Sequence, residues 1–131
     1  MTKFFYNYKI IFYSINFFLI FLYLFPGSLI GQVLYGSKKI QPQITPDFII
    51  SSNHFYVFVL VSLIGFFTFI GKKEIRILII YLILLSIILE LLHLIITERT
   101  FQWADLFGNL MGVVVVIIIR KLIKKYAFFK K

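Results

Sequence analysis

Residues 90–112 read ELLHLIITERTFQWADLFGNLMG and set polar side chains inside and between two strongly apolar runs. A carboxylate on an apolar segment costs about 2.5–3.5 kcal/mol at the centre of a bilayer and less near its surface. Such groups therefore face a protein interior, a partner or a water-filled cavity. We expect the rest of the chain to enclose the polar side chains of this stretch, which include Glu90, His93, Arg99, Asp105 and Asn109.

The composition of the 131-residue chain is that of an integral membrane protein. Hydrophobic residues make up 61% of it and aromatic residues 20%, and the mean hydropathy is +0.98. Soluble domains are only about 45–50% apolar. The length fits a single domain, residues 1–131, which four spans of about 20 residues each would nearly fill. Cysteine is absent, which excludes disulfides, iron–sulfur clusters and thiol catalysis.

The apolar runs predict an all-α fold, a polytopic bundle of four transmembrane helices. A longer connection, about residues 31–53, contains glycine and proline and is expected to be irregular and non-cytoplasmic. The first run is longer than the apolar region of a signal peptide, so we expect it to remain uncleaved. The expected spans are about residues 10–30, 54–71, 75–97 and 101–119.

The basic residues predict the orientation of these spans. Eleven lysines and arginines lie at the N-terminus, in the turn between the second and third spans and in the C-terminal tail, whereas Lys38, Lys39 and Arg99 lie on the other side. Cytoplasmic segments carry the excess of basic residues, so both termini are expected in the cytoplasm. The net charge of +9 is thereby assigned to topology and anionic lipid rather than to nucleic acid.

Two polar stripes are expected to meet between the last two spans. Glu90 and His93 are three residues apart and share one helical face, as do Asp105 and Asn109, which are four apart. A tight turn of three residues, 98–100, would make the two helices adjacent. The polar faces would then point at each other near the non-cytoplasmic surface.

Other residues complete this predicted cluster. Arg99 lies in the turn, where its charge is expected to compensate the two carboxylates. His54 opens the second span and comes within reach from that helix. Gly108 and Gly112 form a G-x-x-x-G spacing, which allows a neighbouring helix to approach closely.

The cluster has three interpretations: hydrogen bonds that hold the bundle together, a binding or catalytic pocket, and a metal site. The Glu90-x-x-His93 spacing occurs in di-iron bundles, but those need a second such motif and further glutamates. A zinc ion has suitable ligand types in His54, His93 and either Glu90 or Asp105, without a diagnostic spacing. We therefore predict no metal and no cofactor. A nucleotide-binding glycine motif and a serine-hydrolase motif are also missing.

Phe101 and Trp103 begin the fourth span beside the turn. Aromatic residues of this kind gather at membrane interfaces, so an interfacial belt is the preferred interpretation. A stacking wall for a sugar or an aromatic ligand is the alternative.

These residues resemble the VanZ-like family of small bacterial membrane proteins, which is named for a teicoplanin-resistance accessory protein. The shared pattern is a His at the entry of one span, E-x-x-Q/H near the end of the next, an Arg in the following turn, and D-x-x-x-N-x-x-G. In this chain the pattern falls on His54, Glu90, His93, Arg99, Asp105, Asn109 and Gly112. The chain differs from the family at Ile50 and Ser51, where an Asp-Lys pair is usual, and at His93, where Gln is usual.

The resemblance implies a compact helical module in the bacterial cytoplasmic membrane, associated in some members with low-level glycopeptide resistance. We expect its outward polar pocket to bind a lipid headgroup, an envelope precursor or a glycopeptide-related ligand. The protein would then influence envelope composition or glycopeptide susceptibility. The alternatives are a membrane-embedded hydrolase or transferase for a lipid-linked substrate, and a structural helper subunit. A non-enzymatic module is preferred, because no nucleophile with a recognisable motif accompanies the histidines.

Overall fold

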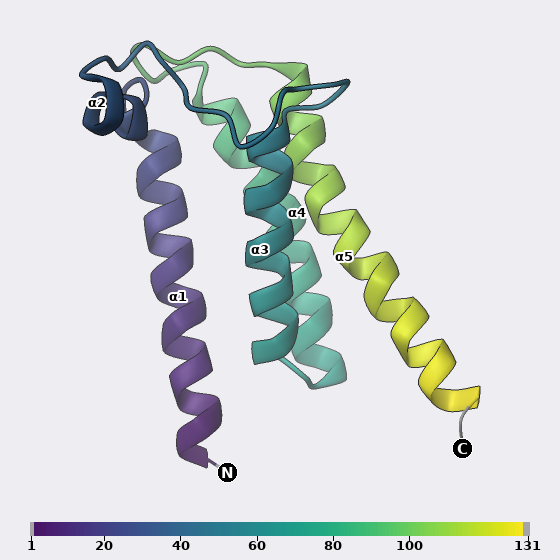
Figure 1. Ribbon diagram of the computed structural model, residues 1–131. Helices are drawn as coiled ribbons and strands as arrows, with labels where there is room; N and C mark the ends of the chain where they lie inside the picture. Colours follow the sequence, from purple (N-terminus) through teal and green to yellow (C-terminus); the bar gives the residue numbers. More distant parts are fainter. Residues whose placement is uncertain (1, 130–131) are drawn as a thin grey trace.

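The computed structural model describes residues 2–129, which form five α-helices and no strand. The predicted all-α class is confirmed for these residues. At one end of the molecule lie α2 and the connections that precede α3 and α5, and we call this the loop end (Figure 1). The short α3–α4 turn lies at the opposite end (Figure 1). The helices are α1 (Thr2–Leu24), α2 (Leu29–Tyr35), α3 (Ser52–Thr68), α4 (Lys72–Leu92) and α5 (Trp103–Phe129).

Among the described residues, two helices are long and apolar enough to cross a membrane, over Lys73–Leu92 of α4 and Trp103–Tyr126 of α5. A third crossing results if α1 and α2 are counted together as one span, although these helices are bent by 79°. The remaining apolar helix, α3, has 17 residues. Length and composition thus support two or three crossing helices and association with a membrane.

The first apolar run, expected to be helical over about 10–30, is broken after Leu24. Pro26 has no backbone N–H, and Gly27 has φ of 72°, a left-handed conformation that favours glycine. Ser28 then caps α2, because its side chain accepts a hydrogen bond from the N–H of a first-turn residue. The chain therefore turns away from the axis of α1 instead of continuing along it.

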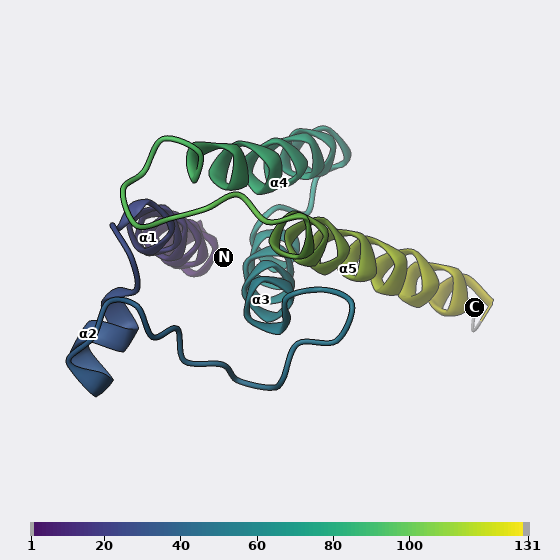
Figure 2. The ribbon, with the colours of Figure 1, turned by 90° about the horizontal axis from the view of Figure 1, so that it is seen from above.

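The connection between α2 and α3 is tied to the start of α3 and runs around the outer side of that helix (Figure 2). The Asn53 amide donates to Pro42 O at 2.6 Å and accepts from Ile44 N at 2.9 Å. Asp47 Oδ1 accepts a hydrogen bond from Ser52 N at 2.7 Å. The expected irregular connection is thus partly helical, in α2, and its remainder is held by specific hydrogen bonds.

The packing of α5 on α3 depends on Gly108 and Gly112, both buried. A Cβ atom on Gly108 would lie 2.7 Å from Ser51 O, and one on Gly112 would lie 2.7 Å from Phe55 O. Real side chains do not approach backbone oxygens this closely, so only glycine permits this separation of the helices. The structure places the G-x-x-x-G spacing at this contact.

Apolar side chains from α1, α3, α4 and α5 form one core, in which Phe58, Leu82 and Val113 are completely buried. Large apolar side chains such as Phe17 and Ile80 are exposed on the outer surface. Since soluble monomers rarely expose large contiguous apolar patches, this surface is suited to contact with lipid.

The third predicted span differs from the structure at its outer end. Residues up to Thr97 are expected to be helical, but α4 ends at Leu92 and the connection to α5 covers 93–102. Gln102 N donates to Glu90 Oε1 at 2.9 Å, which draws the end of the connection back over the end of α4. The predicted three-residue turn is therefore wrong, because contacts outside α4 favour an earlier end to the helix.

Candidate functional site

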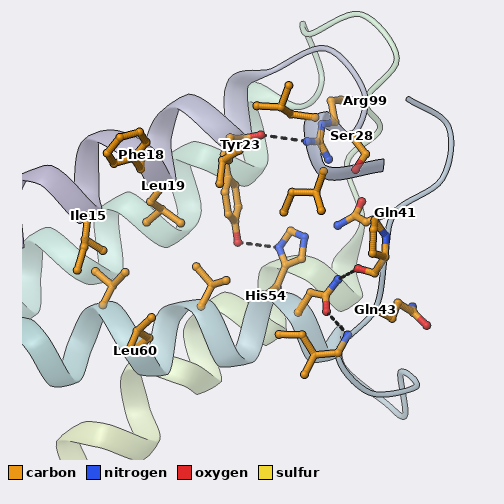
Figure 3. A pocket seen from close by; sticks show the side chains of 18 of the residues that line it. Ile15, Phe18, Leu19, Tyr23, Ser28, Gln41, Gln43, His54, Leu60 and Arg99 are labelled. Atoms are coloured by element: carbon orange, nitrogen blue, oxygen red, sulfur yellow. Dashed lines mark hydrogen bonds between the residues drawn. The ribbon is translucent and has the colours of Figure 1, made fainter. Parts of the chain in front are cut away.

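A buried hydrogen-bond network near the loop end joins four helices. The Tyr23 hydroxyl of α1 donates to Asn109 Oδ1 of α5 at 2.7 Å. It also lies 3.0 Å from His54 Nδ1 of α3, a contact that Figure 3 shows. Asn109 Oδ1 also lies 3.1 Å from His54 Nδ1. On its other side Asn109 Nδ2 donates to Ser86 O of α4 at 3.2 Å. Tyr23, His54 and Asn109 are all buried, so these bonds replace hydration.

The network assigns the tautomer of His54. The single hydroxyl proton of Tyr23 is directed at Asn109 Oδ1, and that oxygen can only accept. His54 Nδ1 must therefore carry a proton and donate it to these two oxygens. In the neutral ring Nε2 then has a lone pair, and it faces Asp105 Oδ2 at 3.5 Å.

The tautomer of His93 is likewise fixed by its hydrogen-bond partner. Its Nε2 lies 3.1 Å from the backbone oxygen of Tyr23, which can only accept, so Nε2 carries the proton. The ring also stacks on the Tyr23 ring with centroids 5.8 Å apart. The lone pair on Nδ1 then faces Glu90 Oε2 at 3.3 Å, without the geometry of a hydrogen bond. In their neutral forms the two imidazoles thus direct lone pairs at two carboxylates, of which Glu90 is fully buried and Asp105 is 15% exposed.

Arg99 lies elsewhere than predicted. Its Nε donates to Phe25 O at 3.2 Å and its Nη2 to Leu22 O at 3.1 Å. Within residues 2–129 no ion pair joins Arg99 to Glu90 or Asp105, so the expected pairing is not formed. The last carbonyls of a helix have no partner within the helix. Arg99 satisfies that of Leu22 in the last turn of α1 and the carbonyl of Phe25, which directly follows the helix.

Burial lowers the pKa of the Arg99 guanidinium below its ordinary value, while the acidic groups nearby oppose that shift. An arginine remains charged in proteins, so it also brings a positive charge to the negative end of the α1 dipole.

A cavity of about 430 Å³ lies between α1 and α3 beside the network. Its walls along the two helices are apolar and include Ile15, Phe18, Leu19, Val57, Leu60 and Val61. Polar side chains line it near the loop end, as Figure 3 shows for some of them: Ser28, Gln41, Gln43, Asn53, His54, His93 and Arg99. Phe18 and Leu60 are 62% and 54% exposed, so the cavity opens sideways through the outer surface of the bundle.

The structure brings five of the predicted pocket residues close together, namely His54, Glu90, His93, Asp105 and Asn109. Only His54, His93 and Arg99 among the predicted set line the cavity itself. Glu90, Asp105 and Asn109 belong to the buried cluster beside it.

Tyr23 is the residue that the sequence analysis missed. A tyrosine at the end of an apolar run is a weak signal, because buried Tyr hydroxyls usually find a partner but the sequence does not say which one. Its bond to Asn109 joins residues 86 positions apart, so no local spacing reveals it.

Trp103 is 65% exposed, and its ring stacks on Phe107 with an interplanar angle of 29°. The Phe101 ring meets it edge-on. Trp103 is not among the residues that line the cavity, so a stacking role at that site has no support. The interfacial belt stays a prediction.

The chain was compared with protein-family models, with curated proteins and with solved structures, and no match was found in any of the three.

Proposed function

We propose that this protein is a VanZ-like, four-span protein of the bacterial cytoplasmic membrane that binds an amphiphile, a lipid or envelope precursor, in the cavity between α1 and α3. The observation that carries the proposal is the division of the cavity into apolar walls along the helices and a polar region near the loop end. By this binding the protein would influence envelope composition and glycopeptide susceptibility.

The cavity suits such a ligand in size and access. Its volume of about 430 Å³ lies within the range of about 300–1,000 Å³ that is usual for ligand sites. The side opening at Phe18 and Leu60 would admit an acyl chain directly from the bilayer. Arg99 supplies a positive charge at the polar region, which favours an anionic headgroup.

We predict that both termini lie in the cytoplasm and the loop end outside, with α1, α3, α4 and α5 as the four crossings. At about 1.5 Å per residue, the 17 residues of α3 cover about 25 Å, close to the hydrocarbon thickness of about 30 Å. A reporter that works only in the cytoplasm should be active when fused after Lys131 and inactive when fused at Lys39. A reporter that works only outside the cytoplasm should give the opposite result. Activity outside the cell after Lys131 would refute this topology.

We predict that filling the cavity expels the ligand. Val57→Trp places a large ring against an apolar wall and should lower co-purified lipid about tenfold, which corresponds to about 1.4 kcal/mol of binding free energy. Mass spectrometry of lipid extracted from the purified protein measures this. Val114→Trp is the matched control, because Val114 is exposed on α5 and does not line the cavity. Equal lipid content in the two variants would contradict the assignment.

The same pair of variants tests the effect on the envelope. In cells exposed to a teicoplanin-type glycopeptide, Val57→Trp should lose the change in susceptibility that the wild type confers, at an unchanged protein level. Val114→Trp should keep it. Retention by both variants would favour a structural helper over a binding protein.

A further inference from the structure

We propose that His54, Glu90 and Asp105 form a binding site for one divalent transition-metal cation, buried near the loop end between α3, α4 and α5. This inference concerns the cluster beside the cavity and goes beyond the proposed binding of an amphiphile. Each of the three side chains offers one ligand atom, and these atoms all lie within 4.8 Å of one another.

The distances suit a small cation. Zinc binds nitrogen and oxygen ligands at about 2.0–2.2 Å, so the ligand atoms of a tetrahedral site are about 3.3–3.6 Å apart. His54 Nε2 and Asp105 Oδ2 lie 3.5 Å apart. Glu90 completes the set, because one of its carboxylate oxygens lies within 4.8 Å of a ligand atom from each of the other two side chains. The tautomer that Tyr23 and Asn109 impose on His54 leaves Nε2 free as a ligand.

The negative charges of the two carboxylates in the cluster favour a bound cation. Glu90 and Asp105 are two carboxylates, and each faces an imidazole nitrogen that has a lone pair when the ring is neutral. Within residues 2–129 neither carboxylate has a lysine or arginine at ion-pair distance, and Arg99 donates to the carbonyls of Leu22 and Phe25 at the end of α1 instead. A buried carboxylate without a counter-charge is costly, and Glu90 is fully buried. One divalent cation balances both charges and replaces the unfavourable contacts between lone pairs and carboxylates with bonds.

An unpartnered atom is the second, independent observation. Glu90 is fully buried, and its Oε2 has no hydrogen bond. Its Oε1 is already held by the backbone N–H of Gln102 at 2.9 Å. Buried polar atoms nearly always have a partner, and one carboxylate oxygen of Glu90 lies within 4.8 Å of a ligand atom of His54 and of Asp105. The incompletely bonded Glu90 carboxylate therefore indicates an unfilled ligand position.

The ligand types select the kind of cation. One imidazole nitrogen with two carboxylate oxygens suits zinc, manganese or iron(II), whereas magnesium and calcium prefer oxygen ligands alone. The ligands are also oriented by outer hydrogen bonds, as in known metal sites: His54 through Tyr23 and Asn109, and Glu90 through Gln102 N.

The test uses the full-length protein without an affinity tag, stripped with EDTA in detergent and then equilibrated with zinc or magnesium chloride. Elemental analysis after gel filtration should find about one zinc ion per chain and no magnesium. Glu90→Gln should lose the zinc. Glu74→Gln, which changes the exposed glutamate in the first turn of the same helix, should retain it.

A second measurement needs no variant, in case Glu90→Gln fails to fold. Zinc should raise the melting temperature of the stripped wild type, since a ligand that binds only the folded state stabilises it, and magnesium should not. A folded wild type that binds no zinc, or that shows the same zinc content in Glu90→Gln, would overturn the proposal. Protons would then hold the two carboxylates in place.

Discussion

Asn109→Leu is expected to destabilise the bundle by about 3 kcal/mol, because a buried polar group left without its partner costs about 1–3 kcal/mol. The substitution removes the acceptor for the Tyr23 hydroxyl and for His54 Nδ1, and the donor to Ser86 O. Asn109 is completely buried, so water does not replace these bonds. Unfolding of the purified protein by increasing SDS in mixed micelles measures the loss.

Asn16→Leu is the matched control for that prediction. Asn16 is also buried, but its amide donates to Phe12 O within α1 and accepts only one bond from another helix, that of the Tyr81 hydroxyl. Interhelical hydrogen bonds in membranes average about 0.6 kcal/mol, so its loss should be about 1 kcal/mol. Equal losses in the two variants would show that the network around Tyr23 is no stronger than an ordinary pair.

Gly112→Val is expected to cost about 3 kcal/mol, at the upper end of the range for overpacking. The first side-chain atom alone would lie 2.7 Å from Phe55 O and 2.8 Å from Phe58 Cβ, both on α3. Backbone cannot yield as a flexible side chain does, so α3 and α5 must separate. That movement also pulls His54 away from Asn109 and weakens the network one turn closer to the loop end.

The control for the glycine variant is Met111→Val, which puts the same residue on the exposed face of the same helix. It should change the free energy of unfolding by less than about 0.5 kcal/mol, as is usual for surface positions. The same SDS titration compares the two variants. A Gly112→Val protein as stable as Met111→Val would mean that α3 and α5 are not in close contact.

Features that depend on near neighbours in the chain were predictable. Apolar runs bounded by charges and glycine indicated the helices, and the spacing of Asp105 and Asn109 placed both on the face of α5 that meets the buried cluster. The G-x-x-x-G spacing indicated a close helix contact, and the structure locates it against Ser51 and Phe55. These features follow from helical periodicity, which the order of residues contains directly.

Contacts between distant parts of the chain determined the end of α4, the role of Arg99, the place of Tyr23 and the cavity. Arg99 donates to carbonyls 74 and 77 residues away, and His93 contacts a carbonyl 70 residues away. Such bonds form only when α1 is packed beside the end of α4. No regular spacing of residues in the sequence indicates them. A buried donor takes the nearest available acceptor in space, so its partner is determined by packing rather than by residue type.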